Sequence, residues 1–191
     1  MATVTYDALM DRGWVRLNVP TPYLPYADGG FPTPSGKCEF YSERMAQMGL
    51  DPLPAFTPPH EFPEHVPDLA RKYPLTLISS PRHQFLNSTF VNIASLRRDA
   101  EPEVTLHPAD AGQRLVTDGM EVVVFNDRGA FSAVARVADS VRAGVAWAPS
   151  IWWGKLSGDG HNANETTSQK LTDMGGGPVF YDNLVEIAPA E

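Results

Sequence analysis

Eight polar side chains lie within eleven residues, directly after a short apolar segment at residues 75–78. These side chains are Ser79, Ser80, Arg82, His83, Gln84, Asn87, Ser88 and Thr89. An arginine and backbone N–H groups can bind phosphate, and the ring of Phe85 can cover a heterocycle. The loop therefore suits a large, polar and partly aromatic anionic ligand. Serine, proline and asparagine also form turns whatever the function, so an ordinary surface turn is the competing interpretation.

A second polar segment runs from residue 152 to residue 182 without a clear strand pattern. A loop of this length inside a compact domain is usually functional or disordered, and its two tryptophans and a tyrosine argue against disorder. Asn162 and Asn164 each offer a donor and an acceptor, so either could bind the edge of a heterocycle or a ribose. Either could equally bond its own backbone in a turn.

Several other chemistries lack the residues that they need. The five histidines, at positions 60, 65, 83, 107 and 161, do not follow the spacing of metal ligands, so we expect no self-contained metal site. The single cysteine, Cys38, excludes an internal disulfide, and we expect no iron–sulfur cluster in this chain. No Gly-x-Ser-x-Gly sequence marks a hydrolase elbow. The glycine triplet at residues 175–177 is not a dinucleotide fingerprint, because no strand precedes it.

The charge and hydropathy of the chain argue against two classes of partner. The sequence has 15 Lys and Arg against 23 Asp and Glu, a formal net charge of −8, which disfavours general affinity for nucleic acid or anionic membranes. No apolar run approaches the roughly 20 residues that span a bilayer. The first residues have neither the basic segment nor the apolar core of a signal peptide. We therefore expect no membrane insertion and no export signal in this chain.

The elements that must position the two polar loops lie in the second part of the chain. Residues 1–72 are rich in proline and aromatic residues, and only residues 39–48 look helical, so an extended arm is predicted there. From residue 73 onward short strands alternate with turns, and a helix is predicted from Pro108 to about Leu115. The predicted strands are residues 75–78, 103–106, 120–125, 130–137, 145–151 and 184–187. This pattern favours a mainly β fold, a barrel rather than an α/β sheet.

The order of several short motifs resembles a known family. The motifs are Thr-Pro-Ser-Gly-Lys-Cys-Glu-Phe-Tyr-Ser at residues 33–42, the loop at residues 79–89, Val-Thr-Leu-His-Pro-Ala-Asp-Ala at residues 104–111, Asp-Gly at residues 118–119, Asn-Asp-Arg-Gly at residues 126–129, Asn-Ala-Asn at residues 162–164 and Asp-Met-Gly-Gly-Gly at residues 173–177. Together they resemble the C-terminal part of molybdopterin oxidoreductases, a family that includes dimethyl sulfoxide reductase, periplasmic nitrate reductase and formate dehydrogenase. The resemblance covers nearly the whole chain.

The resemblance implies a fold and a site. Residues 73–191 would form a double-psi β-barrel that binds bis-(molybdopterin guanine dinucleotide), and residues 1–72 the arm with one short helix that precedes it. Asn164 would be the asparagine of a family motif in which Thr166 stands where leucine is commoner, and Tyr181 falls where some members place a lysine. The residues expected to contact the cofactor are Ser79, Ser80, Arg82, His83, Gln84, Phe85, Asn87, Ser88, Asn162, Asn164, Thr166 and Tyr181.

The resemblance also implies a role within a larger enzyme. The chain would be the C-terminal cofactor-binding domain of a molybdenum oxidoreductase, with molybdenum ligated from upstream domains, and would not catalyse a reaction alone. Its partners would be those upstream domains or a larger catalytic subunit, and it would be cytoplasmic or exported with its parent enzyme.

Two alternatives belong to other functional classes. The first is a stand-alone double-psi barrel that acts as an interaction or assembly module without cofactor. The second, a self-processing decarboxylase on the same fold, needs a Gly-Ser cleavage point, whereas only the reverse order occurs, at residues 35–36 and 157–158.

Overall fold

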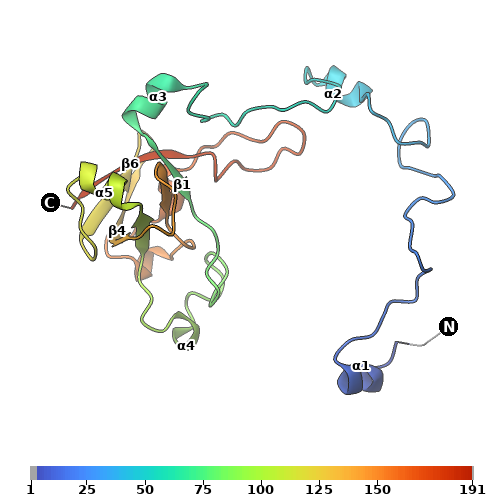
Figure 1. Ribbon diagram of the computed structural model, residues 1–191, viewed down its shortest axis with the longest axis horizontal. Helices are drawn as coiled ribbons and strands as arrows, with labels where there is room; N and C mark the ends of the chain where they lie inside the picture. Colours follow the sequence, from blue (N-terminus) through green and yellow to red (C-terminus); the bar gives the residue numbers. More distant parts are fainter. Residues whose placement is uncertain (1–3, 191) are drawn as a thin grey trace. The chain divides into compact units, whose positions relative to one another are not determined.

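The computed structural model describes residues 4–190 and divides the chain into two compact units (Figure 1). One unit ends at Ala55 and the other begins at Phe56. The predicted boundary between residues 72 and 73 stays a prediction, but residues 56–72 belong to the same compact unit as the strands.

Over residues 4–55 the N-terminal unit contains two short helices and much irregular chain. Helix α1 (Tyr6–Arg12) begins where the Thr5 hydroxyl accepts a hydrogen bond from the backbone N–H of Ala8, and ends at Gly13 with φ +74°. Helix α2 (Glu43–Gln47) is shorter than predicted, because Ser42 is extended and caps its N-terminus. No side chain among residues 4–55 is buried.

A third helix, α3 (Pro67–Lys72), leads into the first strand. The prediction of one helix in residues 1–72 was therefore wrong, since α1, α2 and α3 all lie there. The signals for α3 were local: a proline at its first position, Asp68 in its first turn, and Arg71 with Lys72 in its last turn.

Six strands form a closed barrel within the described residues, which confirms the predicted mainly β barrel (Figure 1). The strand order is β1-β5-β2-β4-β3-β6, and the pairs β1/β5 and β2/β4 are parallel whereas the others are antiparallel. Among the described residues, two short α-helices and two short 3-10 helices, η1 (Gly154–Leu156) and η2 (Ala163–Thr166), lie between strands. The bounds are β1 (Leu75–Ile78), α4 (Ala94–Arg97), β2 (Glu103–Leu106), α5 (Pro108–Gln113), β3 (Glu121–Phe125), β4 (Ala130–Val137), β5 (Val145–Trp147) and β6 (Leu184–Pro189).

The barrel encloses the main hydrophobic core. Alternate residues of β3 and β4 point inward, so Val122, Val124 and Phe131 are buried whereas their neighbours are not. A second, smaller cluster joins Phe85, Val91 and Trp152 from the two long loops. Burial of one such aromatic or aliphatic side chain contributes about 1.5–3 kcal/mol. The second cluster thus ties the loop after β1 to the loop after β5.

Candidate functional site

A cavity of about 330 Å³ lies beside the end of β1. Its polar lining combines Ser79 and Asn87, from the loop after β1, with Asn164 and residues 167–170, from the loop after β5. Ile151, Leu171, Pro178 and Phe180 supply the apolar lining. Concave sites of this size, with a few convergent polar groups, are typical of small-molecule binding. The structure therefore brings together three of the residues that the sequence predicted.

Local geometry explains why two of these residues stand where they do. Ser79 follows β1 and continues its alternation, so its side chain is 5% exposed. Asn87 has φ +44°, a left-handed conformation, in a tight turn in which Leu86 and Thr89 pair. Asparagine tolerates this conformation better than other side chains apart from glycine. Turn geometry thus favours asparagine at position 87, where the residue also lines the cavity.

Asn164 lies in a short 3-10 helix, η2 (Ala163–Thr166), that is held from both ends. The side chain of Asn162 caps η2, because its Oδ1 accepts a hydrogen bond from the backbone N–H of Asn164 at 3.0 Å. At the other end Thr166 is fully buried, and its hydroxyl donates to the Ala163 carbonyl and accepts from Asn183 Nδ2. Asn162 and Thr166 therefore position η2, while Asn164 faces the cavity.

Arg82 does not line the cavity. Its side chain is 15% exposed, and its Nη2 lies 2.7 Å from Glu103 Oε1. The guanidinium also lies over the ring of Trp152, 5.9 Å from the centroid. The buried Nε of Arg82 has no hydrogen-bond partner among the described residues. The sequence predicted that Arg82 binds a phosphate of the cofactor. In this structure its charge is instead neutralised by Glu103.

The remaining predicted residues lie elsewhere. Ser80 accepts a hydrogen bond from Trp147 Nε1 at 2.8 Å, and Phe85, 2% exposed, packs inside the second cluster rather than against the cavity. Tyr181 is 44% exposed and packs edge-on against Phe180. Three more of the predicted residues, His83, Gln84 and Ser88, are exposed in the loop after β1 and do not line the cavity.

Sequence reasoning missed a lysine and an aromatic ring. Among the described residues that line the cavity, Lys170 is the only one with a positive charge, and Phe180 is the only one with an aromatic ring. Both reach the cavity because the chain folds back on itself where Leu171 pairs with Pro178. A run of hydroxyl and amide residues before a lysine was the available signal. Nothing local in that run predicts the return of the chain.

Asp159 holds the loop that precedes η2. One carboxylate oxygen accepts from the backbone N–H of His161 at 2.9 Å, and the other from that of Ser132 on β4 at 2.6 Å. Burial of Asp159 tends to raise its pKa, but these hydrogen bonds stabilise the charged form and the pKa is lowered from 3.8. The carboxylate therefore ties residues 159–161 to the barrel most firmly when it is ionised.

The Asp159 contacts predict a pH dependence. Because the folded pKa is depressed, the stability from this carboxylate is complete above its ordinary pKa and is lost as the pH falls through the folded pKa. We expect the difference in free energy of unfolding between wild type and Asp159→Asn to shrink from about pH 6 to about pH 2. Urea unfolding at a series of pH values measures it. A difference that stays constant over this range would contradict the assignment.

The described residues do not suggest a metal site or a membrane span. Residues 4–190 contain no group of three or more His, Cys, Asp or Glu side chains that could hold a metal ion. None of the helices in that part of the chain is long and apolar enough to cross a membrane.

Comparison with known proteins gives a consistent result. Residues 75–184, more than half of the chain, match the family described as "Molydopterin dinucleotide binding domain". Probable oxidoreductase YoaE of Bacillus subtilis (strain 168) is 34% identical over 188 residues, which cover 98% of this chain and 26% of that protein. Dimethyl sulfoxide reductase DmsA of Escherichia coli (strain K12) is 31% identical over 169 residues, which cover 81% of this chain and 20% of that protein. The chain thus spans roughly a fifth to a quarter of the length of these relatives.

A solved structure agrees with the sequence matches. Acetylene hydratase from Pelobacter acetylenicus is similar with a TM-score of 0.75 and 26% sequence identity, over 88% of this chain and 25% of that one. From the family match over residues 75–184, the closed six-stranded barrel and these relatives, we conclude that the chain belongs to the molybdopterin dinucleotide-binding domain family.

Proposed function

We propose that the barrel binds the guanine dinucleotide end of bis-(molybdopterin guanine dinucleotide) in the cavity beside β1. The observation that carries this proposal is the convergence of Ser79 and Asn87, from the loop after β1, with Asn164, from the distant loop after β5, around one cavity that is also lined by Lys170. Each of the three was expected from the sequence to contact a cofactor of this kind.

The donor set of the cavity fits such a ligand. A dinucleotide presents phosphates, hydroxyls and a purine edge, which need neutral donors and acceptors more than a large net charge. Hydroxyl and amide side chains supply these groups, the ammonium of Lys170 can meet a phosphate, and the ring of Phe180 offers an apolar face. The net charge of −8 is therefore compatible with the proposal, because the local lining decides binding.

The role of this chain is to bind and orient. When bound, the molybdopterin cofactor would supply redox chemistry at its metal. Ser79, Asn87, Asn164 and Lys170 would hold the nucleotide end, and the hydrogen bonds at Thr166 would keep η2 in place. We propose that the chain acts as a domain of a larger molybdenum oxidoreductase, whose other parts ligate the metal and whose cellular location, cytoplasmic or exported, it shares. The lengths of its relatives support this proposal.

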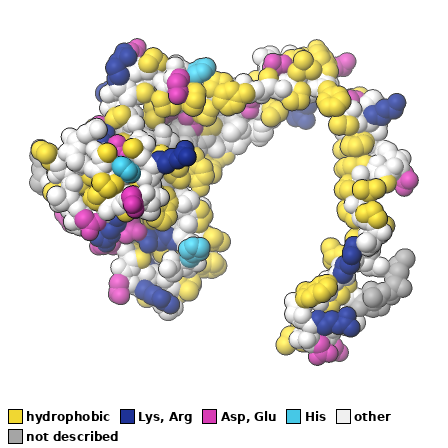
Figure 2. Space-filling view, in the orientation of Figure 1, with side chains coloured by type: hydrophobic (Ala, Val, Ile, Leu, Met, Phe, Trp, Pro, Cys, Tyr) yellow, Lys and Arg dark blue, Asp and Glu magenta, His cyan; other side chains and the backbone are white. Residues whose placement is uncertain are grey.

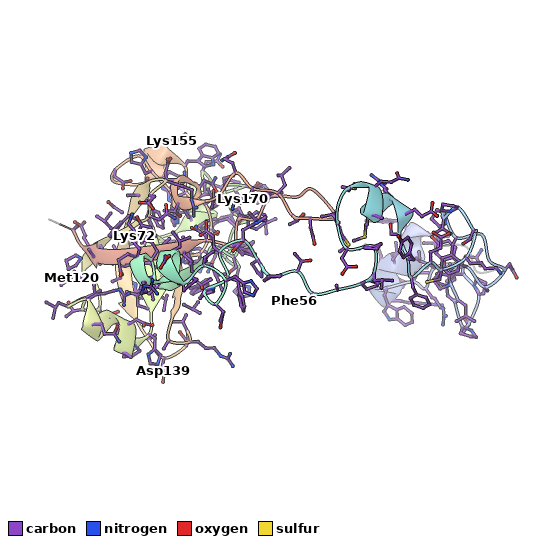
Figure 3. The ribbon with its side chains drawn as sticks, turned by 90° about the horizontal axis from the view of Figure 1, so that it is seen from above. Phe56, Lys72, Met120, Asp139, Lys155 and Lys170 are labelled. Atoms are coloured by element: carbon purple, nitrogen blue, oxygen red, sulfur yellow. The ribbon has the colours of Figure 1, made fainter. Side chains whose placement is uncertain are left out.

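Titration of the 191-residue chain with guanosine diphosphate, followed by NMR, tests the proposal. We expect amide shifts at Asn87 and Asn164, and we expect Lys170→Met to weaken binding about tenfold, since a charge-assisted hydrogen bond contributes about 1.5–3 kcal/mol. Lys155→Met is the matched control, because Lys155 lies in a short 3-10 helix, η1 (Gly154–Leu156), over the ring of Trp153 and outside the cavity lining (Figure 3). Equal weakening by both variants, or shifts confined to other surfaces, would contradict the site.

A second candidate function is an interaction module that binds no cofactor. The N-terminal unit favours it, because its apolar side chains are exposed over its length (Figure 2). Trp14, Tyr23 and Phe40 are 70%, 59% and 78% exposed. Exposed apolar surface of this extent marks a protein contact more often than a free chain. A folded sample with no nucleotide shifts, which co-purifies with a larger protein through residues 1–55, would favour this function.

A further inference from the structure

We propose that Glu61, which precedes the residues matched by the family, is a positioning residue for the cavity. Acting through Arg128, it would hold in place the turn that carries Asn164. This inference rests on the proposed function for its meaning in ligand binding. Its structural part stands on contacts within the unit that begins at Phe56.

The carboxylate of Glu61 is buried, and both of its oxygens accept hydrogen bonds. The residue is 8% exposed, and its two oxygens accept from Arg128 Nη1 and Nη2 at 2.5 and 3.2 Å. One oxygen also accepts from the backbone N–H of Leu184, at the start of β6, at 2.7 Å. A planar guanidinium meets a carboxylate in this paired manner with defined geometry, which an ammonium group cannot reproduce. The pair thus fixes the orientation of Arg128.

Arg128 in turn holds the end of η2. While paired with Glu61, it donates from Nε to the carbonyl oxygen of Thr166 at 2.6 Å. The next residue in the hairpin, Gly129, lies so close that an added Cβ would stand 2.9 Å from the carbonyl oxygen of Glu165. The hairpin turn between β3 and β4 therefore packs directly on the backbone of η2. Displacement of Arg128 would release the turn that presents Asn164 and the lining residues that follow it.

The segment around Glu61 also contacts the far side of the cavity wall. The backbone N–H of Glu61 donates to Asp182 Oδ1 at 2.7 Å. His60 Nε2 lies 3.1 Å from the carbonyl oxygen of Leu171, which lines the cavity. Residues 60 and 61 thus contact the stretch between η2 and β6 directly at Leu171 and Asp182, and η2 itself through Arg128. The segment before the barrel therefore supports the loop that carries the lining residues, although it contributes no lining residue itself.

Glu61→Gln tests this role against a closely matched control. Gln keeps the shape and one acceptor for Leu184, but loses the charge that orients Arg128. The control is Glu186→Gln, because Glu186 pairs with Arg114 in the same two-bonded manner, at 2.5 and 3.2 Å, and within residues 4–190 neither side chain of that pair bonds to a lining residue. Guanosine diphosphate affinity of the 191-residue chain is measured by NMR, at a temperature at which both variants are folded.

We expect Glu61→Gln to weaken nucleotide affinity about tenfold, by analogy with residues that orient metal ligands, whose loss weakens metal binding roughly 10–100-fold. Glu186→Gln should stay within about twofold of wild type. Equal affinity losses in the two variants would reduce Glu61 to a general stabilising residue, and wild-type affinity in both would also overturn the inference.

Hydrogen exchange in the unliganded chain separates this inference from the proposed function. If wild type fails to bind nucleotide, the proposed function fails, but the amide protons of Asn164 and Thr167 still report on η2. They should exchange faster in Glu61→Gln than in Glu186→Gln if Glu61 positions this turn. Equal exchange in the two variants would overturn the inference whatever the chain binds.

Discussion

Arg128→Met is expected to lower the free energy of unfolding by about 3–5 kcal/mol, because it leaves the buried carboxylate of Glu61 without its cation. Glu61 is 8% exposed, so water cannot fully replace the guanidinium. The carbonyl of Thr166 and the side-chain oxygen of Asn183 lose a donor as well, at 2.6 and 3.1 Å. Asn126 Nδ2 still reaches both oxygens, so the unpaired carboxylate carries most of the cost. Urea unfolding followed by tryptophan fluorescence measures the loss.

Two further variants separate this cause from others. Glu61→Gln combined with Arg128→Met removes both charges but keeps an acceptor for Leu184, so it should recover much of the stability that the single variant loses. Arg71→Met breaks an exposed ion pair with Asp68, whose side chains are 73% and 90% exposed, and should cost far less. A double variant as unstable as Arg128→Met would show that loss of packing, and not an unpaired carboxylate, is responsible.

Much of the barrel could be predicted because its signals are local. The strands at residues 75–78, 103–106 and 130–137 are apolar or alternating segments bounded by turn residues, and the structure reproduces their bounds. The helix after His107 follows from a proline at its first position. The strand order could not be read in this way, since it depends on pairings between strands far apart in the sequence.

The same difference between local signals and tertiary contacts applies to the candidate site. Ser79 and Asn87 could be identified because they follow a predicted strand, and Asn164 because it lies in an unusually long polar loop. The contacts of Arg82 could not be predicted, since its partner Glu103 lies in the next strand and is shared with Arg136. Lys170 depends on a return of the chain at Leu171, and the role of Glu61 depends on a partner in a distant hairpin. Residue type reveals a possible contact, but only tertiary structure reveals the partner.

Phe85→Ala is expected to lower the free energy of unfolding by about 3–5 kcal/mol, the usual cost of deleting a buried aromatic side chain. Phe85 is 2% exposed, and its ring meets that of Trp152 edge-on, with the ring centroids 5.5 Å apart. Val91, fully buried, belongs to the same cluster. The loss should therefore also loosen the loop between β1 and α4, which carries Asn87. Thermal and urea unfolding measure the change.

Phe90→Ala is the matched control for Phe85→Ala, because it removes the same side chain from the same loop at a residue that is 47% exposed. Exposed substitutions of this kind cost within about 0.5 kcal/mol. The two variants also decide between the role that the sequence predicted for Phe85, a ring that covers a ligand, and the role that its packing in the second cluster indicates, a ring that holds the loop. Loss of nucleotide affinity without loss of stability in Phe85→Ala would support the first role. The second role predicts that Phe85→Ala loses stability. It also predicts that Phe85→Leu retains both stability and affinity, because an apolar side chain still fills the cluster.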